Sequence, residues 1–408
     1  MYLKDRLKSF KSYNSTLCAA YVCADRGVPA FGSKGCSLHI QEISRTLSQQ
    51  QIPVSLFVAS IGGSCPDTLT PNSVHRIKHA HLDDRAAREH SDIQDNLNTI
   101  KKLRKSGPFD LVYERYSLWS YAGMAYARKQ GVPAVLEVNA PLIEEQQRYR
   151  SLIDKDAAEA ISRRCFADAT LILAVSRQIA DYLSQFSETK GKVHLLPNGV
   201  NTEHFSTVIN QRRHQKRPFT LGFVGTLKPW HGVENLVACF AQLHQCYTGI
   251  KLLIVGDGPQ RQSLQKQIIE LGIEHAVNMT GAVPPEHMPD YYAMMDVGVA
   301  PYPDNIPFYF SPLKIFEYMA AGLPVVASDI GQISEVVAHQ KTGLLYRAGD
   351  QTQLFTALEA LILTPVEALR LGEQGRQTAV NQHSWQQRVD EILQLTGLRQ
   401  GASPYGSA

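Results

Sequence analysis

Two oppositely charged residues, Lys314 and Glu317, stand three positions apart in an otherwise apolar or small-residue stretch, residues 309 to 328. The Ser311-Pro312 pair before them is typical of a helix start, and the Gly-Leu-Pro after them is typical of a helix end. The predicted helix has Lys314 at its third position. A cation there opposes the helix dipole unless an anion binds nearby. The spacing alone fits an anion-binding lysine as well as a solvent-exposed lysine that pairs with Glu317.

Glycine-containing turns follow several predicted strands and could bring backbone amides close to an anion. The segment GTLKPWHG holds Gly225, Thr226, Lys228 and His231, GDGP holds Gly256 and Gly258, and FGSKGCS holds Gly32, Lys34 and Gly35. Each turn alone is a weak signal, because tight turns use glycine everywhere. FGSKGCS lacks the full GxGxxG pattern, so dinucleotide binding is not indicated. Trp230 is expected to pack in the core, and Lys228 fits an exposed loop charge as well as a binding role.

Charged residues also follow two strands of the first half of the chain. The segments YERYSLW at 113 to 119 and EVNAPLIEEQQRYR at 137 to 150 are expected to lie at the mouth of a cleft. Their candidates for binding an acceptor are Glu114, Arg115, Asn139, Glu144 and Arg148. The alternative for each is a solvated loop charge, which is the usual fate of such residues.

No group of residues has the spacing of a metal site. The DKD at 154 to 156 falls in a predicted helical run, whereas a metal-binding DxD needs a strand end. The seven cysteines are scattered and form no close CxxC pair, which favours free thiols in a reducing compartment. The sequence therefore predicts neither a bound metal nor a zinc site.

These residues need elements that bring them together, and the chain alternates strand-like and helical segments throughout. Such alternation predicts parallel sheets with crossover helices, hence an α/β fold with two doubly wound domains facing across a cleft. The polar, basic segment 206–218 separates the two halves. The predicted domains are 1–205 and 206–382, and 383–408 is expected to form a helix returning to the first domain, plus a tail.

The overall composition excludes several classes of protein. The 408 residues are 44% hydrophobic and 19% charged, with a formal net charge of +3, so no strong electrostatic footprint for nucleic acid is present. The apolar run near residue 20 is interpreted as a first strand and not as a signal peptide, because a glycine-bearing loop and an amphipathic helix follow it. No stretch approaches the roughly 20 apolar residues of a membrane helix. The expected location is the cytoplasm, and contact with the inner face of the membrane stays open.

Four segments resemble a known family in their order and spacing. They are LLPNGVNTEHF at 195–205, FVGTLKPWHGVENL at 223–236, LLIVGDGPQRQSL at 252–264 and SPLKIFEYMAAGLPVVASDIGQISEVV at 311–337. They resemble the retaining glycosyltransferases of family four, which have the GT-B architecture and use nucleotide diphosphate sugars. HSWQQRVDEILQL near the end is similar to the terminal helix of that family.

The resemblance implies a role for each candidate residue. Lys314, Lys228, His231 and Asn139 would act at the reacting sugar and the leaving phosphate, and Glu317 would accept hydrogen bonds from ribose hydroxyls. The other implied donor-binding residues are Ser311, Pro312, Leu313, Tyr309, Gly225, Thr226, Gly256 and Gly258. Gly32, Lys34, Gly35, Arg115, Glu144 and Arg148 would serve the acceptor or a phosphate. Four residues depart from the family pattern: Tyr309 stands at the position of its first glutamate, Thr226 and His231 at those of its arginine and lysine, and Asn139 at that of its histidine.

The function implied by the resemblance is transfer of a hexose to an acceptor hydroxyl, in polysaccharide or glycoconjugate synthesis. The nucleotide diphosphate sugar is a co-substrate, and no cofactor, metal or nucleic acid is expected. The expected acceptor is a carbohydrate or a lipid-linked molecule. Two alternatives stay open: a nucleotide-sugar epimerase or hydrolase on the same fold, and a non-catalytic protein that binds sugar nucleotides.

Overall fold

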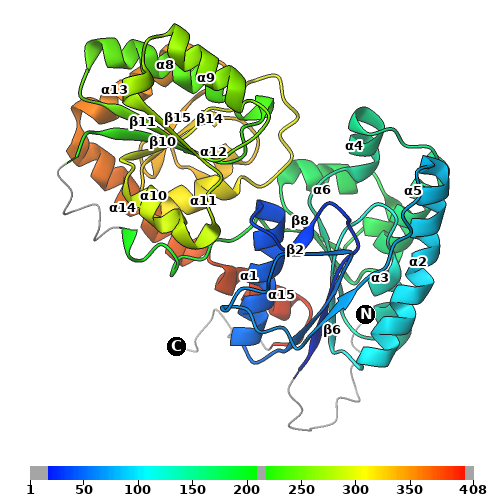
Figure 1. Ribbon diagram of the computed structural model, residues 1–408. Coiled ribbons are helices and arrows are strands. Elements are labelled where there is room, and N and C mark those ends of the chain that lie inside the picture. The colour runs from blue at the N-terminus through cyan, green and yellow to red at the C-terminus, as the bar shows by residue number, and fades with distance from the viewer. Residues whose placement is uncertain (1–16, 209–216, 400–408) are drawn as a thin grey trace, which may run out of the picture.

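The computed structural model describes residues 17–208 and 217–399, and these form two α/β domains, each built on a parallel sheet with helices on its faces (Figure 1). The predicted fold class is therefore confirmed. Within these residues, every helix is too short or too polar to cross a bilayer.

The N-terminal domain contains a seven-stranded parallel sheet in the order β5-β3-β1-β6-β7-β8-β9. Its strands are β1 (Ala19–Cys23), β3 (Val54–Val58), β5 (Ser73–Arg76), β6 (Leu111–Arg115), β7 (Ala134–Val138), β8 (Leu171–Ala174) and β9 (Val193–Leu195). The helices are α1 (Gly35–Gln49), α2 (Arg85–Ser106), α3 (Ala122–Gln130), α4 (Leu142–Tyr149), α5 (Lys155–Asp168) and α6 (Arg177–Leu183). A small second sheet pairs β2 (Pro29–Phe31) with β4 (Ser60–Gly62).

The C-terminal domain contains a six-stranded parallel sheet in the order β12-β11-β10-β13-β14-β15. Its strands are β10 (Thr220–Val224), β11 (Lys251–Val255), β12 (Val277–Gly281), β13 (Val297–Ala300), β14 (Val325–Asp329) and β15 (Gly343–Arg347). Its helices are α8 (Val233–Cys246), α9 (Arg261–Glu270), α10 (Met288–Ala293), α11 (Leu313–Ala320), α12 (Ile333–Val336), α13 (Gln351–Leu363) and α14 (Pro365–Gln382).

The central strands are short apolar runs because both faces of a parallel sheet are covered by helices. Every residue of β1, β3, β7 and β10 is buried. Each long predicted strand is present, although trimmed at its ends. The sequence prediction missed β2, β4, β5 and β15, and FGSKGCS follows β2 and not the first strand directly.

The last helix, α15 (Trp385–Leu395), lies against α1 of the N-terminal domain (Figure 1). Its apolar residues Trp385, Val389 and Ile392 belong to the same buried cluster as Ile40 and Leu47 of α1. Ser384 caps the helix and forms a capping box with Gln387. A segment from the end of the chain thus completes the core of the first domain.

Candidate active site

A cavity of about 1960 Å³ lies between the two domains, at the carboxyl ends of their strands. Its N-terminal wall comes from loops after β1, β5, β6 and β7 and from α1, α2 and α4. Its C-terminal wall comes from residues 229–235 and from the loop 303–313 before α11. Ligand pockets typically measure about 300 to 1,000 Å³, so this cavity has room for two ligands at once. Proteins with parallel α/β sheets typically bind their ligands at the carboxyl ends of the strands, where this cavity lies.

Lys314 lies just behind the C-terminal wall, and its amine has no hydrogen-bond partner in the part of the chain that the structure describes. The residue is only 8% exposed, and its Nζ makes no hydrogen bond to any described residue. The Nζ lies 4.2 Å from the centre of the Phe223 ring and 5.1 Å from that of Tyr302. Burial lowers the pKa of Lys314 to about 7, although Glu317 acts in the opposite direction. The solvent-exposed, paired lysine considered from the sequence is therefore wrong.

Glu317 has a different partner. Its carboxylate accepts a hydrogen bond of 2.7 Å from the Tyr292 hydroxyl. Burial raises the pKa of Glu317, and Tyr292, His204 and Lys314 oppose that rise. The two charged residues of the opening motif therefore share a helix without forming an ion pair.

The start of α11 differs from the prediction. The helix begins at Leu313, so Lys314 is its second residue and Pro312 is its N-cap. Ser311 does not cap the helix, because its Oγ accepts a hydrogen bond of 3.2 Å from the backbone N–H of Asn198. The predicted capping by Ser311 was wrong since this hydroxyl joins the two domains instead.

The turn after β10 approaches Lys314 closely. Gly225 has φ of 143°, and a Cβ there would lie 3.1 Å from Lys314 Nζ, so the site favours glycine. His231 donates from Nδ1 to the carbonyl oxygen of Thr226. Burial, with Lys314 and Lys228 nearby, lowers the pKa of His231 to about 3. His231 is therefore neutral at this turn and adds no positive charge beside Lys314.

Two other predictions for this turn meet different outcomes. Trp230 is 44% exposed and lines the cavity, so the expectation of core packing was wrong. Lys228 is half-buried, with its Nζ 5.4 Å from the centre of the Trp230 ring.

Gly256 and Gly258, in the turn after β11, do not line the cavity. A Cβ on either would collide with the backbone of Gly225 or Leu227, so these glycines allow two turns to pack together.

The N-terminal floor of the cavity holds a buried carboxylate that the sequence analysis did not select. Glu137, at 2% exposure, accepts hydrogen bonds from His39 Nε2 at 2.9 Å and from Arg115 at 2.8 Å. Asn139 Nδ2 and the Tyr113 hydroxyl also donate to it. Burial alone would raise the pKa of Glu137, but His39, Arg115 and Asn139 outweigh it and lower the pKa to about 2.

The other N-terminal candidates divide into two groups. Gly35, Arg115, Asn139 and Arg148 line the cavity, whereas Gly32, Lys34 and Glu144 do not. A Cβ on Gly35 would lie 2.7 Å from Leu313, so the starts of α1 and α11 meet across the cleft.

Glu114 is buried at 1% and faces α3, accepting hydrogen bonds from Ser120 and Met124. Its expected place at the cleft mouth was wrong because neighbouring strand residues point to opposite faces.

Tyr309 joins the two walls of the cavity. Its hydroxyl donates to Glu145 of α4, the neighbour of the predicted Glu144. Its carbonyl oxygen accepts a 2.5 Å hydrogen bond from Ser176 Oγ, which also caps α6. The residue that replaces the family's first glutamate therefore contacts the N-terminal domain.

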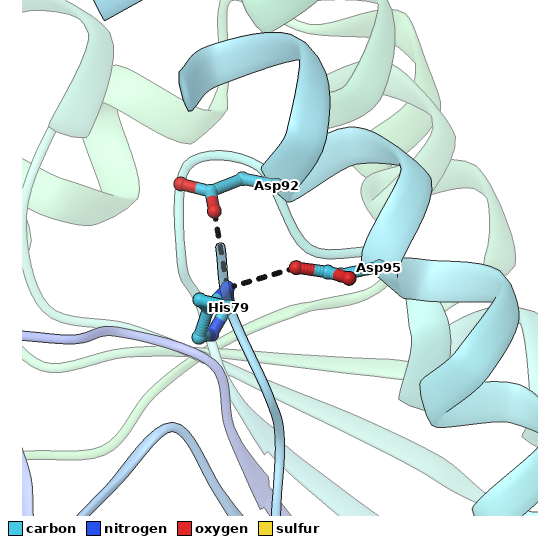
Figure 2. A group of neighbouring side chains, drawn as sticks. All are labelled: His79, Asp92 and Asp95. Carbon is cyan, nitrogen blue, oxygen red and sulfur yellow. Dashed lines mark hydrogen bonds and ion pairs between the residues drawn. The ribbon is translucent and has the colours of Figure 1, made fainter. Parts of the chain in front are cut away.

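A second polar cluster lies in the N-terminal part of the cavity (Figure 2). His79 Nδ1 lies 3.0 Å from Asp92 Oδ1 and 3.3 Å from Asp95 Oδ2. Three such ligand atoms within 4.8 Å of one another could hold a metal ion, and the sequence analysis did not find this group. The two aspartates are three apart on α2, but His79 precedes that helix, so only the structure brings them together. Arg26 also donates to Asp92, which partly balances the carboxylates without a metal.

The DKD segment has a structural role. Asp154 caps α5 by accepting a hydrogen bond of 2.9 Å from the backbone N–H of Ala157. Asp156 lies in the first turn of that helix, where a carboxylate suits the helix dipole. Neither aspartate lines the cavity.

Comparisons with known proteins identify the family. The model described as "Glycosyltransferase Family 4" matches residues 33–204, and that described as "Glycosyl transferases group 1" matches residues 218–364. Together they span most of the chain and both walls of the cavity. The chain belongs to the family-four glycosyltransferases.

Relatives agree with this assignment, and a solved structure has the same fold. The chain is 29% identical to a GDP-mannose-dependent alpha-(1-6)-phosphatidylinositol monomannoside mannosyltransferase of Mycolicibacterium smegmatis, over 60% of this chain and 66% of the relative. It is 23% identical to a D-inositol 3-phosphate glycosyltransferase of Pseudarthrobacter chlorophenolicus, over 83% and 84%. The fold is similar to a sucrose-phosphate synthase from Thermosynechococcus elongatus, with a TM-score of 0.72, 20% identity and coverage of 94% and 98%. These neighbours show the GT-B fold.

Proposed function

We propose that this glycosyltransferase moves a hexose from a nucleotide diphosphate sugar to an acceptor hydroxyl with retention of configuration. The observation that carries the proposal is the buried amine of Lys314 beside the cavity, whose Nζ makes no hydrogen bond to any described residue. A buried charge without a partner is costly, and an anionic ligand would provide one. A diphosphate held between the turn at Gly225 and the start of α11 meets that requirement.

Departure of the nucleotide leaves negative charge on the diphosphate, and fixed cations stabilise it in a site with little water. In the proposal, Lys314 takes this role and Lys228 assists from the turn after β10. Glu317 accepts hydrogen bonds from the ribose hydroxyls. Retention follows from attack on the same face of the sugar, assisted by the leaving phosphate, as the family resemblance implies. No metal ion and no further cofactor take part.

The acceptor occupies the N-terminal part of the cavity. Arg26, His79, Arg115 and Arg148 offer many hydrogen-bond donors there, which suits a polyhydroxylated or phosphorylated acceptor. The relatives' names, phosphatidylinositol monomannoside and inositol 3-phosphate glycosyltransferases, favour a carbohydrate or lipid-linked carbohydrate of this kind. We place the reaction in the cytoplasm, at the inner face of the membrane when the acceptor is a lipid.

Binding and turnover of a panel of uridine, guanosine and adenosine diphosphate sugars test the proposal. One donor should raise the melting temperature, because a ligand at 100 times its dissociation constant adds about 2.7 kcal/mol of stability. That donor should be consumed faster when an acceptor extract or methyl glycoside is added. Rapid conversion of the donor sugar without acceptor would indicate an epimerase. Binding without any turnover would indicate a sugar-nucleotide-binding protein.

A further inference from the structure

The carboxylate of Glu137 is buried below the cavity, yet most of its partners belong to the cavity wall. His39, Arg115 and Asn139 line the cavity, whereas Glu137 itself does not. All three donate hydrogen bonds to the one carboxylate, and Tyr113 provides a fourth from beneath. Arg115 and Glu137 are direct neighbours in the parallel pairing of β6 with β7. One buried anion therefore orients three side chains at the floor of the site.

The hydrogen bond between Glu137 and Asn139 fixes which way the amide of Asn139 points. An ionised carboxylate only accepts hydrogen bonds, so the amide nitrogen of Asn139 faces Glu137. The pKa of Glu137, lowered to about 2, keeps it ionised at neutral pH. The amide oxygen of Asn139 receives no hydrogen bond from any described residue. It is left as an acceptor on a half-buried side chain that lines the cavity.

Arg115 is held in the same way. One of its terminal nitrogens donates to Glu137, and its side chain is 14% exposed. A guanidinium group carries five N–H donors, so most remain for a ligand. The carboxylate thus sets the position of a donor and of an acceptor side by side.

We propose that Glu137 is a positioning residue for the transfer reaction: it orients Asn139 to accept a hydrogen bond from a sugar or acceptor hydroxyl, and Arg115 to donate to an oxygen of the same ligand. This inference rests on the proposed function. Glu137 itself touches no substrate, and it acts through the two side chains that do.

A buried carboxylate on the neighbouring strand provides a matched control. Glu114 is as deeply buried as Glu137 but faces α3, and it accepts hydrogen bonds from the backbone N–H of Met124 and from Ser120, of which only Ser120 lines the cavity. Replacing either glutamate by glutamine keeps the shape of the side chain; Glu137→Gln removes a full charge, and Glu114→Gln removes only part of one, because burial raises the pKa of Glu114 to about 7. Only Glu137→Gln changes the acceptor that orients His39, Arg115 and Asn139.

The test measures turnover, nucleotide-sugar affinity and melting temperature for Glu137→Gln, Glu114→Gln and Asn139→Ala. Glu137→Gln should lower turnover per folded molecule by about 100-fold, the loss typical of a reacting group misplaced by 1 Å. Its affinity for the nucleotide sugar should stay within twofold of wild type, since Lys314 and Glu317 lie on the other domain. Glu114→Gln should lower the melting temperature and leave turnover per folded molecule unchanged. Asn139→Ala should lower turnover with little change in melting temperature.

Asn139→Ala keeps the inference testable if Glu137→Gln does not fold, because Asn139 is half-buried and tolerates truncation. An active wild-type protein whose turnover is unchanged by Asn139→Ala, or changes equally in Glu137→Gln and Glu114→Gln, would overturn the inference alone. A wild-type protein that neither binds nor consumes any nucleotide sugar would overturn the proposed function, and this inference with it.

Discussion

A buried ionisable residue lies behind each wall of the cavity, and the two residues differ in their hydrogen-bond partners. Lys314 in the C-terminal wall has no hydrogen-bond partner among the described residues, whereas Glu137 in the N-terminal floor has four donors. Burial lowers the pKa of Lys314 to about 7 because little opposes it. The donors around Glu137 outweigh burial and lower its pKa to about 2. In the proposed reaction, Glu137 holds its neighbours in place, and Lys314 gains its partner from the bound diphosphate.

The largest effect is expected from deleting the unpartnered charge. Lys314→Met keeps an unbranched apolar stem and removes the ammonium group, so the protein should become more stable while turnover falls. The fall should be about 100-fold to 1,000-fold, as when one group that stabilises transition-state charge is lost. Steady-state kinetics and thermal unfolding of one preparation check both. A lower melting temperature with unchanged turnover would mean that Lys314 serves only the fold.

The neighbour of Lys314 should affect binding more than catalysis. Glu317→Gln keeps the shape of the side chain but loses the charged acceptor, which should weaken nucleotide-sugar binding by about 1 to 3 kcal/mol. Turnover at saturating donor should change little. Calorimetric titration and kinetics measure the two quantities. Tyr292→Phe is the control, because it removes the hydroxyl that donates a hydrogen bond to Glu317 and leaves the carboxylate in place. If both variants change only the melting temperature, Glu317 has no role with the donor.

The two charges should also respond differently to pH. In the protein without ligand, Lys314 loses its proton above its pKa of about 7. A bound diphosphate favours the protonated amine, so ligand binding above pH 7 is accompanied by uptake of a proton. Nucleotide-sugar affinity should therefore fall by up to about tenfold per pH unit above pH 7 and level off below it. Titrations in buffers of different ionisation enthalpy measure the proton uptake. The dependence should vanish in Lys314→Met, and a wild-type affinity constant from pH 6 to 9 would contradict this account.

The contribution of ionised Glu137 to stability should change only in acid. Its folded pKa of about 2 lies below the ordinary value of 4.5, so its contribution to stability is complete above pH 4.5 and is lost as the pH falls towards 2. Denaturant unfolding between pH 3 and 7 should show a steeper acid loss in wild type than in Glu137→Gln. Equal slopes in the two proteins would show that the four donors do not stabilise the ionised form.

The smallest effect is expected from removing metal ions. Because the proposed reaction uses Lys314 and not a divalent ion against the diphosphate, EDTA should leave turnover within about twofold of its value. The Asp92→Asn variant is the control for the cluster of His79, Asp92 and Asp95 in Figure 2. Complete loss of turnover in EDTA, restored by one divalent ion in wild type but not in Asp92→Asn, would assign a metal to that cluster.

The fold was largely predictable because its central strands are apolar runs bounded by turns. The missed strands β5 and β15 lie at sheet edges, and β2 and β4 have only three residues each, so none is a long buried run. The site was less predictable. Nothing in the sequence distinguishes a buried Lys314 from an exposed one. Arg115 and Glu137 meet only through the register of β6 with β7, although the spacing of Tyr113 from Arg115 and of Glu137 from Asn139 places each pair on one face. His39 comes from α1, and no local signal connects it to them.

The packing of α15 against α1 has a consequence for synthesis on the ribosome. Trp385, Val389 and Ile392 fill the buried cluster that also contains Ile40 and Leu47, and they are translated about 340 residues later. Domains generally fold as they emerge, N-terminal domain first. Here the apolar surface that α15 covers on the first domain stays exposed until the whole second domain has been translated. Chaperone demand during translation should therefore fall on the N-terminal domain.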